Sequence, residues 1–225
     1  MAHAFHPDAA LGKGVAILVR KDRLLTFKEV VAVRFTDEDQ GARSVGIVSI
    51  YESSTGAAND VNSNMNVNVK YGPARVFFIM CSVNLSNYGN EDKQLEQATI
   101  LVQSIEKVRM GLRGQNRDCT MHLVIGGNFN MVPGSRVYNY MLSATDHRLG
   151  LTSAYGHFLN GREPAYTTVS SAWEGTTSYL FYTALELGIT NLLDFPAREL
   201  IGKSLPSVEF SSNNFSLQTV FSVYK

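Results

Sequence analysis

The stretch VIGGNFNMVPGSRVYNYM, residues 124–141, decides how the fold of this chain is interpreted. Its first residues continue the apolar run 121–127, which predicts a buried strand that ends in a glycine turn. The amides of Asn128 and Asn130 follow directly, and residues 133–142 predict a turn into a helix. A polar loop between a strand and a helix has the outline of a catalytic loop. Taken alone, however, it is more simply a turn whose amides bond their own backbone.

The bulk composition is that of a soluble globular protein. The chain has 225 residues, of which 44% are hydrophobic and 18% are charged, so we expect a single domain over residues 1–225 with a full hydrophobic core. Its 20 basic and 20 acidic side chains cancel. Any contact with RNA must therefore come from a local patch and not from the overall field.

Targeting signals and cysteines suggest an intracellular protein. The first residues lack the features of a secretory signal, and no apolar run approaches the roughly 20 residues that span a bilayer, so we expect no membrane partner. Cys81 and Cys119 lie in or beside strand-like stretches and are predicted to be buried thiols. This usage indicates a reducing compartment, and the sequence does not distinguish the cytoplasm from an organelle such as the mitochondrion.

Strands and helices alternate without a regular period. Residues 14–20 and 30–35, separated by the turn-like KDR, predict a hairpin. Further strands are predicted at 44–52, 74–85, 121–127, 176–183 and 215–224, and helices at 91–108 and 133–142, the first capped by Asn90. The Asn-rich segment 53–69 has no apolar period and is predicted to be a surface loop insertion. The pattern favours an α+β sandwich with outer helices.

The order of several short segments carries a resemblance to a known family. CSVNLSNY (81–88) precedes one helix, the 124–141 stretch leads into another, EPAYTT (163–168) and YLFYT (179–183) come next, and LPSVEFSSNNFSL (205–217) lies near the end. In this order they resemble the exonuclease-endonuclease-phosphatase superfamily, in the deadenylase-like branch of carbon catabolite repressor-type nucleases, nocturnin and Angel. The resemblance covers residues 13–225. It implies a four-layer α/β/β/α sandwich that lacks the opening strands.

The resemblance also implies which positions would carry catalysis. Members of the family hydrolyse phosphodiesters with Mg²⁺ held by carboxylates and with histidines near the phosphate, because a hard ion prefers anionic oxygen ligands. Each matching position here is uncharged. Asn84 stands at a catalytic histidine, Asn128 at the aspartate of the GDFN motif and Ser178 at a second aspartate. Asn213 and Asn214 replace the closing aspartate and histidine, while Asn130 is retained.

These replacements predict that no catalytic residue, metal site or cofactor site is functional. Each loss of a general acid or base would cost roughly 10²–10⁴ in rate, and with every matched charge gone no partly working unit is left. The family's metal-binding glutamate lies in a QE pair upstream of the matched segment, and this chain contains no such pair. Either the chain is a fragment of a longer protein or it has lost the opening strands together with this ligand.

Other candidate residues have simpler structural explanations. His147 beside Asp146 is the one histidine that suggests a substitute base, but a solvated loop pair explains it more simply. His122 is predicted to be structural, and His3 and His6 lie on an end expected to fray. The basic clusters at 20–23 and 109–117 are interpreted as a hairpin turn and a helix end.

The aromatic residues and glycines also have simpler structural explanations. Trp173, Tyr179, Phe181 and Tyr182 are more simply core residues than platforms for RNA bases, although an RNA-binding protein could use them. The glycines are not spaced as a phosphate-binding loop.

The sequence therefore predicts a catalytically inactive member of a deadenylase-like family. We expect it to act as a scaffold or interaction subunit with protein partners, in an RNA-processing or ribonucleoprotein complex. One alternative is a phosphodiesterase with residual or altered activity, in which neutral side chains hold Mg²⁺ weakly. Another is a metal-independent RNA-binding module, because a cleft without carboxylates repels phosphate less.

Overall fold

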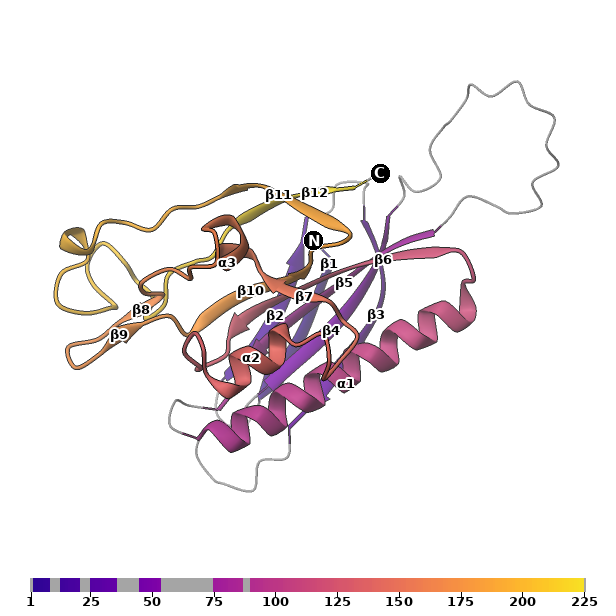
Figure 1. Cartoon of the computed structure of the whole chain (residues 1–225), viewed down its shortest axis with the longest axis horizontal. Helices are drawn as coiled ribbons and strands as arrows, with labels where there is room; N and C mark the ends of the chain where they lie inside the picture. Colours follow the sequence, from indigo (N-terminus) through magenta and orange to yellow (C-terminus); the bar gives the residue numbers. More distant parts are fainter. Residues whose placement is uncertain are drawn as a thin grey trace.

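A six-stranded mixed sheet forms the centre of the protein (Figure 1). The computed structural model describes residues 2–8, 13–20, 25–35, 45–53, 75–86 and 90–224, with the backbone alone for 2–8 and 13. The strand order is β3-β4-β5-β6-β10-β7, with bounds β3 Leu25–Arg34, β4 Val45–Ser53, β5 Arg75–Asn84, β6 Cys119–Asn128, β10 Ser178–Thr183 and β7 Leu151–Ser153. All neighbouring pairs are antiparallel except β5 and β6. The predicted loop insertion lies almost wholly outside the described residues.

Helices cover one face of this sheet. The parallel pair β5–β6 needs a crossover connection, which is the long helix α1 (Glu91–Gln115), and α2 (Arg136–Leu142) lies beside it. The side chain of Asn90 accepts a hydrogen bond from the amide of Lys93 and caps α1 as predicted. The backbone amide and side chain of Arg136 bind Glu91 and Asp92, which fastens the start of α2 to the start of α1.

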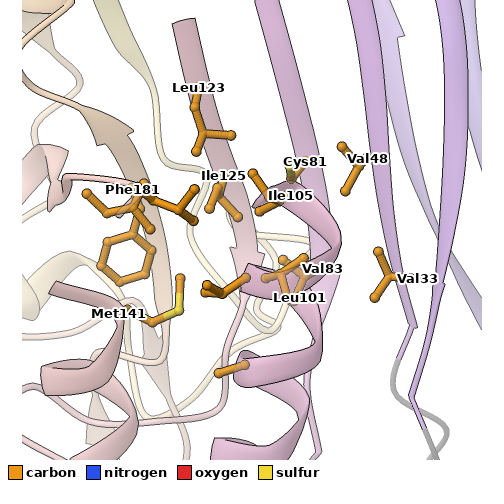
Figure 2. Packing of buried hydrophobic residues seen from close by; sticks show 14 of the residues in the cluster. Val33, Val48, Cys81, Val83, Leu101, Ile105, Leu123, Ile125, Met141 and Phe181 are labelled. Carbon is orange, nitrogen blue, oxygen red and sulfur yellow. The ribbon is translucent and has the colours of Figure 1, made fainter. Parts of the chain in front are cut away.

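The main hydrophobic core fills the space between these helices and the sheet. Figure 2 shows Leu101 and Ile105 of α1 close to Cys81 and Val83 of β5, with Ile125 of β6 beside them. Each of these side chains is 5% exposed or less. This is the burial that the helical period of α1 and the apolar character of β5 and β6 predicted.

Two separate hairpins lie on the opposite face of the sheet. Strands β1 (Ala2–Asp8) and β2 (Lys13–Val19) pair over β3, β4 and β5. Strands β11 (Leu187–Leu192) and β12 (Thr219–Val223) pair beside the short helix α3 (Ala154–Phe158) and pack against β10. A smaller hairpin of β8 (Thr168–Val169) and β9 (Glu174–Gly175), and a 3-10 turn at Arg198–Leu200, extend beyond the sheet.

The predicted pairing of the first strands is wrong. Strand β2 pairs with β1 and not with the 30–35 segment, which belongs to β3 and pairs with β4. The end that carries His3 and His6, expected to fray, is strand β1. The last strand is also shorter than the predicted 215–224, because Phe215 packs instead into an aromatic cluster with Tyr166 and Phe195.

The architecture agrees with an α+β sandwich in its inner layers. Helices lie on one face of a mixed sheet and strands on the other. The second strand layer, however, consists of two hairpins and not of one continuous sheet. No outer helical layer covers these hairpins among the described residues. In the same part of the chain, no helix has the length and apolarity needed to cross a lipid bilayer.

Candidate functional site

Three of the candidate residues form a row across the ends of neighbouring strands. Asn84 on β5 is the parallel partner of Asn128 on β6, and Asn128 is the antiparallel partner of Ser178 on β10. Residues in register on neighbouring strands present their side chains on the same face of a sheet. Asn84 and Asn128 are half-buried, and Ser178 is buried. The structure thus brings together three positions that lie far apart in the sequence.

Asn130 uses its side chain to hold the loop after β6. Its Nδ2 donates to the carbonyl of Leu85 at 2.8 Å, and its Oδ1 accepts from Nδ2 of Asn128 at 3.0 Å. The side chain of Gln94 on α1 donates to the carbonyl of Asn130. Asn130 has a φ of 52°, a left-handed conformation that asparagine tolerates better than most residues. These amides therefore bond their own loop, as the simpler interpretation of this stretch predicted.

Gly127 is required by a close approach of the backbone. A side-chain carbon at this position would lie 2.0 Å from the carbonyl oxygen of Val83 on the neighbouring strand. The adjacent Gly126 differs, because a carbon added there meets no atom within 4 Å. The two glycines at the end of β6 therefore have opposite surroundings, one tightly packed and the other open.

Asn213 and Asn214 join the row from the segment before the last strand. Oγ of Ser178 donates to Oδ1 of Asn214 at 3.3 Å. The carbonyl of Asn213 accepts from Oγ1 of Thr168 at 2.7 Å, and its exposed side chain accepts from Nδ2 of Asn214. The buried hydroxyl of Thr167 accepts from the amide of Ser178 and so holds the start of β10. All six candidate positions lie at one end of the sheet, joined by pairing or hydrogen bonds.

The donor set at this end does not suit Mg²⁺. The available groups are amides and hydroxyls, and several of their oxygens already accept hydrogen bonds from one another. Magnesium binds proteins through one or more carboxylates. Within the described residues, no group of three His, Cys, Asp or Glu side chains lies close enough to hold a metal ion. We therefore derive no catalytic step through a metal.

One half-buried carboxyl, Glu163, belongs to the framework and not to the row. Its Oε1 accepts a hydrogen bond from the hydroxyl of Tyr138 at 2.8 Å. Burial raises the pKa of Glu163, and hydrogen bonds from Ser153 and Tyr138 partly offset this rise. Desolvation, with the nearby Glu163 charge, also raises the pKa of Tyr179, whose ring lies against Tyr138. Glu163 therefore links α2 to the segment after α3.

Neither His122 nor His147 supplies a substitute base. Nε2 of His147 lies 3.0 Å from the carbonyl of Tyr140, and its Nδ1 accepts from the amide of Leu149 at 3.3 Å. His147 is 4% exposed, so it is a buried structural residue and not the solvated partner of Asp146 that we expected. His122 is also buried, as predicted, but neither of its ring nitrogens has a hydrogen-bond partner.

The remaining basic, aromatic and thiol candidates are mostly structural. Arg109 is 11% exposed and forms an ion pair with Glu186 at 3.6 Å, and burial lowers its pKa. Of the 20–23 cluster, residues 21–23 lie outside the described residues. The aromatic side chains of 179, 181 and 182 are buried, whereas Trp173 remains 39% exposed. Both cysteines are free thiols, and Cys81 is buried with its pKa raised by desolvation.

The sequence did not predict the cavity beside the row. A cavity of about 560 Å³ is lined by Phe195, Phe210 and Phe215, with the polar groups of Ser212 and Asn214 at one side. Phe215 contacts both other rings edge-on. The sequence signal for this cavity was the pair of aromatic residues around the closing motif, Phe210 and Phe215. We had assigned Phe215 to a regular strand.

Sequence comparison finds relatives that match part of this chain. No protein-family model matches the sequence. Nocturnin of Drosophila melanogaster is 38% identical over 120 residues, which are 42% of this chain and 18% of the relative. Nocturnin of Mus musculus is 30% identical over 155 residues, 66% of this chain and 34% of the relative. Carbon catabolite repressor protein 4 homolog 2 of Arabidopsis thaliana is 27% identical over 173 residues, 58% and 28%. The matched region thus spans about a third or less of these relatives.

Solved structures agree with this similarity. The human nocturnin catalytic domain with bound sulfate superposes with a TM-score of 0.71 at 21% identity, covering 99% of this chain and 72% of that one. ANGEL2, a 2′,3′-cyclic phosphatase, superposes with a TM-score of 0.72 at 18% identity, covering 98% and 73%. The fold of this chain is therefore the fold of these proteins. The sequence matches and the shared fold together place the chain in the exonuclease-endonuclease-phosphatase superfamily, in the branch of nocturnin, carbon catabolite repressor 4 and Angel.

Proposed function

We propose that this protein is a non-catalytic member of its family that acts as a scaffold or interaction subunit in an RNA-processing or ribonucleoprotein complex. The observation that carries the proposal is the row Asn84, Asn128 and Ser178 with Asn214 bound to it. Phosphodiester hydrolysis needs a group that accepts a proton near neutral pH or a metal that lowers the pKa of water. Amides and a serine hydroxyl without a neighbouring base do neither.

The hydrogen bonding of the loop after β6 also supports this proposal. The hydrogen bonds of Asn130 and Gln94 hold the loop after β6 without any charged group. The framework of the site is thus compatible with loss of the catalytic charges, since asparagine and serine can still bond one another. A protein that keeps its framework after losing its reactive groups remains able to bind partners.

The proposal is tested by incubating the purified chain with 5′-labelled, A-tailed RNA and Mg²⁺. A denaturing gel should show intact RNA after prolonged incubation. The matched control is Asn128→Ala, which removes one member of the row and is checked for folding by circular dichroism. Cleavage by the natural chain that the variant loses would overturn the proposal. Cleavage that both proteins show equally, and that disappears on repurification, would reveal a contaminant and leave the proposal standing.

A metal-independent RNA-binding role is the second candidate. Trp173 leaves part of its indole exposed at the β8–β9 hairpin, close in sequence to Ser178, and stacking of a base on an exposed aromatic ring does not need metal. A native gel of the same incubation tests this role. A shifted band that weakens steeply with salt and is lost in Trp173→Ala would favour RNA binding over a purely protein scaffold.

A further inference from the structure

The cavity beside the row has walls made by three phenylalanine rings. The ring of Phe215 lies 5.9 Å from that of Phe195 and 5.1 Å from that of Phe210, with interplanar angles of 89° and 79°. Because Phe215 is nearly perpendicular to both neighbours, the rings form adjoining walls and not a flat stack. All three side chains are half-buried and line a cavity of about 560 Å³. A cavity of this size suits a small organic group.

The rings are held in place from behind. The ring of Tyr166 lies 6.2 Å from that of Phe195 and 6.1 Å from that of Phe215, and its hydroxyl donates to the carbonyl of Pro196 at 2.6 Å. Phe210 and Phe215 also pack against a buried apolar cluster, which consists of Val169, Ile201 and Leu205. Rings fixed by such packing lose little freedom when a ligand binds, so the cavity is pre-organised.

The polar part of the cavity is negatively charged. Asp194 and Glu209 line it with exposed carboxylates, and none of the described residues that line it is a lysine, arginine or histidine. Oδ1 of Asp194 accepts from the amide of Phe195 at 2.8 Å, and Oε2 of Glu209 accepts from the hydroxyl of Ser207 at 3.4 Å. Within the described part of the chain, neither carboxylate forms an ion pair. Both are therefore available to a cation.

The charges behind the cavity are also mostly negative. Burial raises the pKa of Tyr166, and the nearby charge of Arg198 lowers it. Three carboxylates raise this pKa further, those of Glu199, Glu174 and Asp194. Nε of Arg198 already forms an ion pair with Glu174 at 2.6 Å. The local field therefore favours a positively charged ligand.

This combination of groups disfavours RNA and metal ions. Carboxylates repel the phosphates of RNA. A divalent metal needs several close ligands, and among the described residues no group of three His, Cys, Asp or Glu side chains can hold one. An alkylated ammonium group suits both parts of the cavity, because its methyl groups pack on aromatic rings while its charge is attracted to the ring faces and to carboxylates.

We propose that this cavity binds an alkylated ammonium group, the cation of choline and of methylated lysine side chains. Phe195, Phe210 and Phe215 contact the methyl groups, and Asp194 and Glu209 attract the charge at the rim. A free small cation and a modified side chain of a polypeptide share this chemistry, and the assay below distinguishes them. The inference goes beyond the proposed function, since binding here requires neither catalysis nor its loss.

The test titrates choline into the whole chain and follows binding by NMR. The control ligand is the neutral isostere of choline, in which a carbon atom replaces the quaternary nitrogen. Choline should bind saturably and about tenfold more tightly than the isostere. Asp194→Asn keeps an oxygen for the amide of Phe195 but removes the charge, and Phe210→Leu removes one ring; each should weaken choline by about threefold or more. Asp146→Asn removes an exposed carboxylate that does not line the cavity, and it should bind choline as the natural chain does.

Three results would overturn the inference. They are equal binding of choline and its isostere, no saturable binding of choline, and equal weakening by Asp194→Asn and Asp146→Asn. If circular dichroism shows that Phe210→Leu unfolds, Glu209→Gln replaces it, because this side chain is exposed and its loss of charge should also weaken choline.

A peptide that carries one trimethylated lysine identifies the source of the cation. If it binds more tightly than choline and than the same peptide without methyl groups, the ligand is a side chain of a polypeptide. If it binds no more tightly than choline, the ligand is a free small cation. All these readings are independent of whether the chain cleaves RNA, so failure of this inference leaves the non-catalytic assignment in place, and cleavage of RNA overturns that assignment alone.

Discussion

Buried His122 predicts that this protein loses stability in mild acid. Its ring is 1% exposed, lies 4.9 Å from the ring of Phe78, and has no hydrogen-bond partner at either nitrogen. Desolvation lowers the pKa of His122 from its ordinary value of 6.5, and the charge of Glu186 offsets only part of this. The imidazole therefore stays neutral in the folded protein at a pH where the unfolded chain is already protonated.

The sign and size of the effect follow from proton linkage. Below pH 6.5 the unfolded state binds more protons than the folded state, so the free energy of unfolding falls as the pH falls. If the folded ring stays neutral, going from pH 7.5 to 5.5 costs about 1.4 kcal/mol. The contribution of His122 to stability is fully present above the pKa that this histidine has in the unfolded chain. At lower pH, protonation of the ring in the folded protein would limit any further fall in the free energy of unfolding.

Urea unfolding at these two pH values measures the effect. His122→Leu removes the titrating group and provides the comparison, so contributions from other groups cancel in the difference between the two proteins. The natural chain should lose about 1.4 kcal/mol more than the variant on acidification. An equal pH response in both proteins would show that His122 is protonated equally in its folded and unfolded states, and the reasoning from burial would fail.

Two further substitutions each test one local contact. Gly127→Ala should lower the free energy of unfolding by roughly 2–4 kcal/mol in urea titrations, because the added carbon collides with the carbonyl of Val83. Gly126→Ala is the control and should change this free energy little, so equal effects of the two substitutions would contradict the geometry. Asn90→Ala should cost about 1 kcal/mol in the same assay through loss of the cap on the amide of Lys93, and an unchanged midpoint would show that the cap contributes nothing.

The sequence predicted the elements whose signals are local. The helical period and cap of α1 and the apolar runs of β5 and β6 predicted those elements, because each carries its own burial pattern. The family motifs predicted that positions far apart in the sequence would lie close together. The strand register agrees, because Asn128 pairs with Asn84 on one side and with Ser178 on the other. Whether those positions are catalytically silent stays a prediction for the RNA assay.

Pairing between strands was harder to predict. The KDR turn signal suggested that the strands before and after it pair, yet β2 pairs with β1, whose sequence AHAFHPD has little apolar alternation. Partner choice in a sheet depends on which faces become buried, and this is not a local property. The short strand β11 and the aromatic cavity were missed for the same reason, since Phe195 and Phe215 meet only in the folded chain.

The neutral row has a consequence for how the fold depends on dissolved ions. Carboxylates gathered at the end of a sheet repel one another unless a cation lies between them, so folding of such a site is linked to cation concentration. Asn84, Asn128, Ser178 and Asn214 carry no such repulsion and bond through their amides and hydroxyl. We therefore expect folding of this end of the sheet to be independent of divalent ions, so the protein should assemble equally well in a chelating buffer and in millimolar magnesium.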